Sequence, residues 1–137
     1  MRILVVYQSR TGNTKRIAEA IAEELGVEAL PVLEVTTFSC DLLVLGSGVY
    51  AASLDKTMKR FLSGLDGLCA KKVALFGTSA GGRKPFAMMK RALKQKGIPV
   101  HESTLWIPGE FKFFNKGRPN DQDILEAKEW AKNLKQN

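Results

Sequence analysis

The chain has 137 residues, of which 45% are hydrophobic, and its 21 Lys and Arg against 14 Asp and Glu give a net charge of +7. A chain of this size buries a sizeable apolar core without disulfides or metals, so we expect one domain over residues 1–137. No apolar run reaches the roughly 18–20 residues that span a bilayer, and no leader-like segment precedes the first strand. We therefore expect a cytoplasmic protein without a membrane span.

Residues suited to metal or nucleophilic chemistry are scarce. Cys40 and Cys69 are isolated in the sequence, and His101 is the only histidine. Neither C-x-x-C spacing nor a cluster of Cys and His is present, so no metal site is predicted. The two thiols are interpreted as buried core residues.

The first predicted strand leads directly into a helix. Residues 3–7 form an apolar run, and apolar residues recur at helical spacing over 17–25. Between them lies Ser9-Arg10-Thr11-Gly12-Asn13-Thr14. Free N–H groups of the first helical turn, the positive end of the helix dipole and a glycine that admits close approach favour phosphate binding here. The alternative is that Thr11 or Asn13 caps the helix and Gly12 serves only the turn.

Two strands follow the first helix. Residues 28–35 predict a short edge strand, since an edge tolerates the missing N–H of Pro31. The connection 36–40 is too short for a helix, so this crossover is expected to be a loop. The continuous apolar run 41–46 predicts a central strand that is covered on both faces.

The middle of the chain repeats the order of strand, small-residue loop and helix. Loop 46–54 is followed by an amphipathic helix with Leu54 and Leu65 at the ends of its apolar face. A strand is predicted over 72–76, and it runs into loop 77–83.

The last part of the chain predicts two helices and a fifth strand. The first helix begins near Pro85 and ends near Lys96, where Gly97 is a suitable C-terminal cap. The fifth strand is expected over 100–107, followed by a loop over 108–119. Asn120, with Asp123 three residues on, then begins the last helix in an arrangement close to a capping box.

The order of these elements predicts the fold class. Strands that alternate with helices at this spacing pair in parallel through right-handed crossovers, which gives an open, doubly wound α/β sheet of five strands. Ligands of such sheets bind beyond the carboxyl ends of the strands. Loops 9–14, 46–54 and 77–83 meet there, and each is rich in Gly, Ser or Thr. Their convergence favours a cofactor site over simple helix capping.

Over essentially its whole length the chain resembles the short-chain flavodoxins. Loop 9–14 is similar to the [ST]-x-T-G-x-T loop that binds the FMN phosphate in that family, and residues 46–50 and 117–120 agree with weaker family features. Residues 48–51 are also similar to the second loop of flavodoxin-domain proteins related to the protoporphyrinogen oxidase group. The resemblance implies a flavodoxin-like parallel sheet with strand order 2-1-3-4-5.

The resemblance further implies FMN as the cofactor, with its phosphate in loop 9–14 and its isoalloxazine ring between loops 46–54 and 77–83. Tyr50 is expected to stack on the ring, because an aromatic face packs well on a flat π system, and an ordinary core position is the alternative. The residues implied to contact FMN are Ser9, Arg10, Thr11, Gly12, Asn13, Thr14, Ser47, Gly48, Val49, Tyr50, Ala51, Thr78, Ser79, Ala80 and Gly81.

Position 51 departs from the family pattern. In flavodoxins a glycine-containing peptide beside the ring commonly flips to accept a hydrogen bond from the reduced flavin. Ala51 stands after Tyr50 here, and a non-glycine residue resists a positive φ by about 1 kcal/mol. Weak stabilisation of the flavin semiquinone is therefore expected if residue 51 is the flipping position, and Gly48 is the alternative position.

The net charge of +7 is the second departure from the family pattern, because flavodoxins are typically acidic. Residues 53–100 hold 11 Lys and Arg against 2 Asp and Glu. The two helices of this block are expected to cover the same sheet face. The resulting basic face would steer a redox partner with an acidic docking surface, and a surface tuned for solubility is the alternative. The residues of this face are Lys56, Lys59, Arg60, Lys90, Arg91 and Lys94. No nucleic-acid partner is expected, because no recognised nucleic-acid fold is present.

Three functions are compatible with the sequence. The leading one is a low-potential FMN electron carrier that performs no catalysis of its own. An FMN-dependent reductase or oxidase acting on a quinone or a protoporphyrinogen would need a substrate pocket over the ring, and no long insertion is available to build it. A binding module that has lost FMN is opposed by Arg10, Lys15 and Arg16, since cations near a phosphate favour its binding.

A nucleotide triphosphate site is not predicted. Residues 77–84 approach the G-x-x-x-x-G-K-[ST] pattern, but Arg83 stands where lysine is needed. Lys84 stands where a hydroxyl would hold Mg²⁺.

Overall fold

The computed structural model describes residues 1–50, 53–79, 83–110 and 115–136. Its elements are β1 (Ile3–Gln8), α1 (Asn13–Leu25), β2 (Ala29–Pro31), the 3₁₀ turn η1 (Val32–Glu34), β3 (Cys40–Tyr50), β4 (Ser53–Leu54), α2 (Lys56–Ser63), β5 (Ala70–Ser79), α3 (Lys84–Gln95), β6 (Leu105–Pro108) and α4 (Asp121–Gln136).

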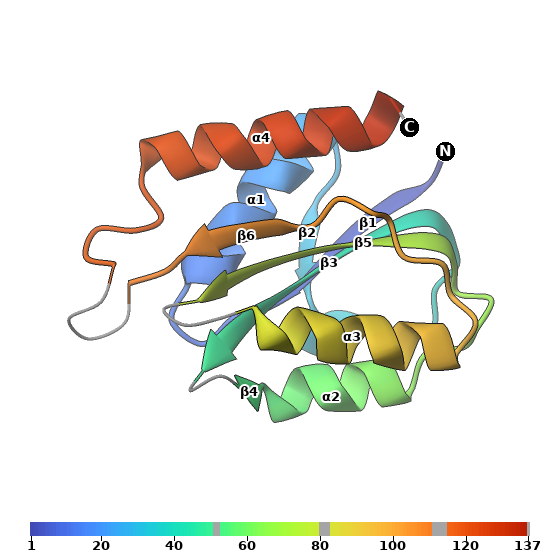
Figure 1. Ribbon diagram of the computed structural model, residues 1–137. Coiled ribbons are helices and arrows are strands. Elements are labelled where there is room, and N and C mark those ends of the chain that lie inside the picture. The colour runs from blue at the N-terminus through green and yellow to red at the C-terminus, as the bar shows by residue number, and fades with distance from the viewer. Residues whose placement is uncertain (51–52, 80–82, 111–114, 137) are drawn as a thin grey trace.

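One sheet organises the molecule, and its strands run in the order β2-β1-β3-β5-β6 (Figure 1). These five strands are all parallel, while the two-residue β4 pairs antiparallel with the end of β3. With β4 set aside, the order is the predicted 2-1-3-4-5, so the expected fold class is confirmed. The longest pairing joins β3 to β5, from Cys40 opposite Ala70 to Val49 opposite Ser79.

Helices cover both faces of the sheet in pairs, α1 with α4 and α2 with α3 (Figure 1). Alternate residues of the central strands supply two separate cores. Val5 and Val44 pack with α1 and α4, whereas Val6 and Leu43 pack with α2 and α3. The central strands are therefore buried on both sides, which explains their unbroken apolar runs. The prediction that the two basic helices share one face is confirmed.

The prediction of a fifth strand over 100–107 is wrong in its first half. Only Leu105–Pro108 form β6, and Val100 makes a single isolated bridge to Val73. The N–H of Ser103 donates to Nδ1 of His101 at 3.0 Å, and the Ser103 hydroxyl accepts from the Trp130 indole at 3.0 Å. The His101 N–H still donates to the Val73 carbonyl at 2.7 Å, so the strand ladder is interrupted over 102–104, beside these side-chain bonds.

The ends of the other elements also differ from the predicted ones. The edge strand is only three residues long and continues into η1, although Pro31 does lie on the sheet edge opposite Tyr7. Leu54 belongs to β4 and Leu65 follows α2, yet both side chains are buried. Both β3 and β5 extend beyond their predicted ends, toward the loops of interest.

The predicted helix caps of α3 and α4 are confirmed. Gly97 follows α3 with a φ of +75°, a left-handed conformation that favours glycine. Asn120 Oδ1 accepts the N–H of Asp123 at 3.0 Å, and Asp123 Oδ2 accepts the N–H of Asn120 at 2.8 Å. Among the described helices, none combines the length and apolar character needed to cross a membrane.

Candidate functional site

The ends of β1, β3, β5 and β6 lie together at the carboxyl edge of the sheet (Figure 1). Three long-range contacts tie their neighbourhood together. The hydroxyls of Thr14 and Thr78 are 2.7 Å apart, the Asn13 side-chain amide donates to the carbonyl of Glu110 at 3.1 Å, and Arg10 pairs with Asp55. The first predicted loop is thus joined to β5, to the segment after β6 and to the start of α2.

Loop 9–14 leaves the N-terminus of α1 open. Gly12 is the N-cap residue with a φ of +92°, and no side chain caps the helix. The alternative in which Thr11 or Asn13 caps α1 is therefore wrong, and the N–H of Gly12 itself donates to Ser9 Oγ at 3.1 Å. A Cβ built on Gly12 would meet no described atom within 4 Å, so the space directly beside Gly12 is open.

The electrostatics of this helix start differ from those of α2 and α4. The first turn of α1 has no acidic residue but carries the cations Lys15 and Arg16, although cations are unfavourable near the positive end of a helix dipole. By contrast, Asp55 caps α2, and two aspartates stand in the first turn of α4. The N-terminus of α1 is therefore an electropositive spot suited to an anion.

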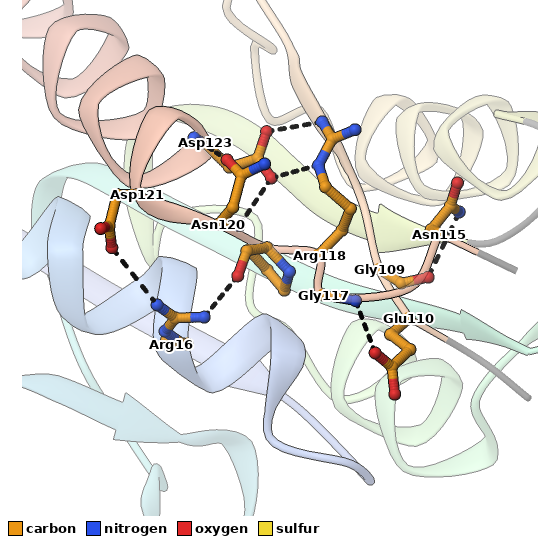
Figure 2. A network of polar contacts seen from close by, with 10 residues as sticks. Arg16, Gly109, Glu110, Asn115, Gly117, Arg118, Asn120, Asp121 and Asp123 are labelled. Atoms are coloured by element: carbon orange, nitrogen blue, oxygen red, sulfur yellow. Dashed lines mark hydrogen bonds and ion pairs between the residues drawn. The ribbon is translucent and has the colours of Figure 1, made fainter.

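Two of the three cations that the sequence placed beside the phosphate have protein partners. Arg10 donates from Nε to Asp55 Oδ2 at 2.8 Å, and its terminal nitrogen lies 2.7 Å from the same oxygen. Arg16 donates to the carbonyl of Pro119 and lies 4.0 Å from Asp121, which joins α1 to the start of α4 (Figure 2). Lys15 is exposed and has no partner among the residues that the structure describes.

Asp55 was not predicted, and it has two functions in the structure. Its Oδ1 accepts the N–H of Thr57 at 2.7 Å, which caps α2, while its Oδ2 pairs with Arg10. The Asp55 side chain is 8% exposed. Burial raises the pKa of this carboxyl, but the hydrogen bonds from Arg10 and Thr57 outweigh burial, so its pKa lies below the ordinary value. If the sequence analysis had begun this helix at Lys56 and not at Leu54, Asp55 would have been recognised as its N-cap residue.

Several predicted cofactor residues lie beneath the loop surface. Thr14 and Thr78 are buried against each other, and the buried Ser47 hydroxyl donates to Gln8 Oε1 at 3.3 Å. The Thr14–Thr78 contact joins the start of α1 to β5, and the Ser47–Gln8 contact joins β3 to β1. Ser79 at the end of β5 is also buried. By contrast, the backbone and side chains from Ser9 to Asn13 reach the surface. A direct contact between any of these residues and a cofactor stays a prediction.

The remaining predicted residues fall at or beyond the end of β3 and β5. Ala51, Ala80 and Gly81 lie outside the described residues. Val49 and Tyr50 end β3, where their backbones pair with Leu54 and Ser53 of β4. The stacking of Tyr50 on a flavin ring stays a prediction.

The segment after β6 is a part of the site that the sequence did not identify. Gly109 packs so closely on α1 that a Cβ there would lie 3.0 Å from Asn13 Nδ2 and 3.4 Å from Thr78 Cβ. Figure 2 shows how the rest of the segment is held: Glu110 Oε1 accepts the N–H of Gly117 at 2.6 Å, and Asn115 donates to the carbonyl of Gly109 at 3.3 Å. The described parts of this segment form one wall beside loop 9–14.

An ion pair anchors the far end of this segment. Arg118 donates to both carboxylate oxygens of Asp123, at 2.6 and 2.7 Å, as Figure 2 shows. The Asp123 side chain is 3% exposed. The hydrogen bonds from Arg118, with help from the N–H of Asn120, hold the pKa of this carboxyl below its ordinary value against the effect of burial.

Known protein sequences are similar to this chain. A family model described as a flavodoxin domain matches residues 4–120. An uncharacterized protein of Methanocaldococcus jannaschii is 31% identical over an alignment of 154 residues that covers both chains completely. The flavodoxin-like domain-containing protein BilS of Clostridioides difficile is 36% identical over 91 residues, which cover 61% of this chain and 50% of BilS.

Solved structures agree at the level of the fold. The chain matches a flavodoxin from the domain Archaea with a TM-score of 0.80 and 22% identity, covering 99% of this chain and 97% of the other. It matches oxidised Flavodoxin 2 from Bacillus cereus with a TM-score of 0.74 and 23% identity, covering 96% and 95%.

Proposed function

The chain belongs to the flavodoxin domain family, and from this premise we propose that it binds FMN and carries electrons between other proteins. The single observation that supports this most directly is the uncapped, electropositive N-terminus of α1 below the open space at Gly12. A phosphate dianion would supply the acceptors and the negative charge that this helix start lacks.

The residues at the surface of loop 9–14 fit a phosphate. The unpaired backbone N–H groups of the first turn of α1 and the hydroxyl of Thr11 would donate to its oxygens, and Lys15 would add charge at close range. Arg10 would act through Asp55, because a move of its guanidinium to the phosphate would leave a buried carboxylate without its partner. The ring would lie beyond the ends of β3 and β5, as the family resemblance implies.

When bound, FMN supplies the electron-accepting chemistry, and the protein's part is to hold and orient it. The two buried aspartates near the site, Asp55 and Asp123, are both engaged with arginines and helix starts. Their carboxylates serve structure and are not free for proton transfer. An electron carrier requires no proton transfer from them.

The first test is the visible spectrum of the purified protein, before and after addition of FMN and desalting, with released flavin identified by chromatography. We expect retained bands of oxidised flavin. A colourless protein that fails to retain added FMN would contradict the proposal.

A substitution at Lys15 tests the phosphate position. Lys15→Glu places an acid in the first turn of α1, where it favours the helix dipole and repels a phosphate. We expect equal or higher thermal stability, together with FMN affinity reduced by about five- to tenfold and riboflavin affinity nearly unchanged. Fluorescence titration with both flavins measures the difference.

The matched control is Lys132→Glu on α4, which makes the same charge change at an exposed position on another helix. An equal effect of Lys15→Glu on FMN and riboflavin, or an effect no larger than that of Lys132→Glu, would contradict the position of the phosphate.

A further inference from the structure

The outer surface of α2 and α3 concentrates positive charge. Residues 56–65 and 67–101 contain no Asp or Glu. Three acids border these stretches. Asp55 pairs with Arg10, and Asp66 accepts the N–H of Leu68 at 2.8 Å, while the exposed Glu102 lies in a shallow hollow with Lys90 and Lys94. The exposed cations on the two helices are Lys56, Lys59, Arg60, Lys84, Lys90, Arg91 and Lys94.

A shallow groove with an apolar floor runs between these two helices. Its volume is about 260 Å³, and its apolar lining comes from Leu54, Leu62, Met88 and Ala92. Met88 is 37% exposed, one of few large hydrophobic side chains of the described residues that face solvent. Lys59 stands on the rim, and at one end Lys96 Nζ donates across the groove to the carbonyl of Ser63 at 2.8 Å.

The dimensions of the groove indicate its occupant. It is smaller than the roughly 300–1,000 Å³ typical of small-molecule sites. The lining positions on α3, from Met88 to Gln95, span eight residues, or about 10 Å at the helical rise per residue. An apolar groove of about two helical turns between two parallel ridges fits a few side chains from one face of a helix.

We propose that the α2–α3 groove docks an acidic amphipathic helix of the redox partner, an inference that rests on the proposed function and names the partner's chemistry. Apolar side chains of that helix would contact Met88 and Ala92, while its carboxylates would lie against the surrounding cations. The groove begins at Leu54 of β4, immediately after the β3–β4 connection. A partner seated there would lie beside the loop expected to contact the flavin ring, which suits electron transfer.

The test uses a labelled peptide of about 18 residues with leucines at helical spacing and glutamates elsewhere, compared with the same composition in scrambled order. Fluorescence anisotropy measures its binding to the full chain as purified. We expect the patterned peptide to bind more tightly than the scrambled one, and binding to weaken with added salt. Lys59→Glu and Met88→Gln should each weaken binding by about fivefold or more, and Lys132→Glu by less than about twofold.

Three results would contradict the proposal that the α2–α3 groove binds an acidic helix. These are equal binding of the scrambled peptide, no effect of Met88→Gln, and tighter binding of a single-stranded oligonucleotide to the same face. The assay needs no flavin. A protein that binds the patterned peptide but retains no FMN would therefore contradict the electron-carrier function and still support binding of an acidic helix in the groove. A protein that retains FMN but does not bind the peptide would contradict only the groove.

Discussion

At the scale of single residues, the Arg10–Asp55 pair is the contact that most shapes the candidate site. It links loop 9–14 to Asp55, the residue that follows predicted loop 46–54 and caps α2. The carboxylate is buried while the Arg10 side chain is 55% exposed, which reduces what the pair contributes. The helix cap and the ion pair use different oxygens of Asp55 and are therefore separable by substitution.

Two variants separate these functions. Asp55→Asn keeps an oxygen that caps α2 but removes the charge, and Asp55→Ala removes both. We expect Asp55→Asn to lower the free energy of unfolding by about 1 kcal/mol and Asp55→Ala by about 1 kcal/mol more. Urea unfolding of the flavin-free protein measures both.

The loss in Asp55→Asn should shrink in high salt if it is electrostatic. Equal stability of the two variants would show that Asp55 does not cap α2 to any useful extent. Wild-type stability in Asp55→Asn would show that Arg10 gains nothing from the charge.

At the scale of elements, α4 and the segment before it determine one wall of the site. Gly109 lies against α1 and β5 at one end, and Arg118 and Asn120 bind to the start of α4 at the other. Arg16 joins α1 to the same region through Pro119 (Figure 2). The position of this wall therefore depends on Asp123, whose carboxylate accepts from both Arg118 and the N–H of Asn120.

The depressed pKa of Asp123 predicts a pH dependence of stability. A carboxyl with a lower pKa in the folded protein contributes stability above its ordinary pKa, near 4, and this contribution is lost as pH falls through the folded value. Asp123→Asn should cost about 1–3 kcal/mol at pH 7 and should show a flatter loss of stability below about pH 4. Urea unfolding between pH 3 and 7 measures both curves.

Asp121→Asn is the matched control, because Asp121 stands in the same helical turn but is fully exposed. Parallel pH curves for Asp123→Asn and the wild type would contradict the assignment of this titration to Asp123.

At the scale of the whole molecule, charge is divided between the two faces of the sheet. The α2–α3 face carries the cations named above, while α1 on the other face carries the exposed Glu19, Glu23 and Glu24. Like charges close together destabilise a folded chain, so the basic face carries an energetic cost. Lys90 and Lys94, four residues apart on α3, are one such pair.

Lys90→Glu converts this like-charge pair into a Glu–Lys pair in the favourable order. We expect the variant to gain roughly 0.4–1 kcal/mol of stability at low salt, and the gain to fade in high salt. Thermal unfolding at two salt concentrations measures it. A loss of stability at low salt would contradict the view that the face is under electrostatic strain.

The sequence by itself determined the order of the strands in the sheet and the position of the candidate phosphate loop. Apolar runs such as 41–46 and the strand-to-helix turn at 9–14 are local signals, and right-handed crossovers leave little freedom in assembling them. For the same reason the shared face of α2 and α3 was predictable.

Only the tertiary structure decided which side chains meet. Asp55 is 45 residues from Arg10, and Glu110 is 97 residues from Asn13, so no local pattern relates them. The start of β6 was likewise unpredictable, because the hydrogen bond from Trp130 to Ser103 depends on how α4 packs over the sheet. Such pairings follow from strand register and helix packing, which are set by the assembled core and not by neighbouring residues in the chain.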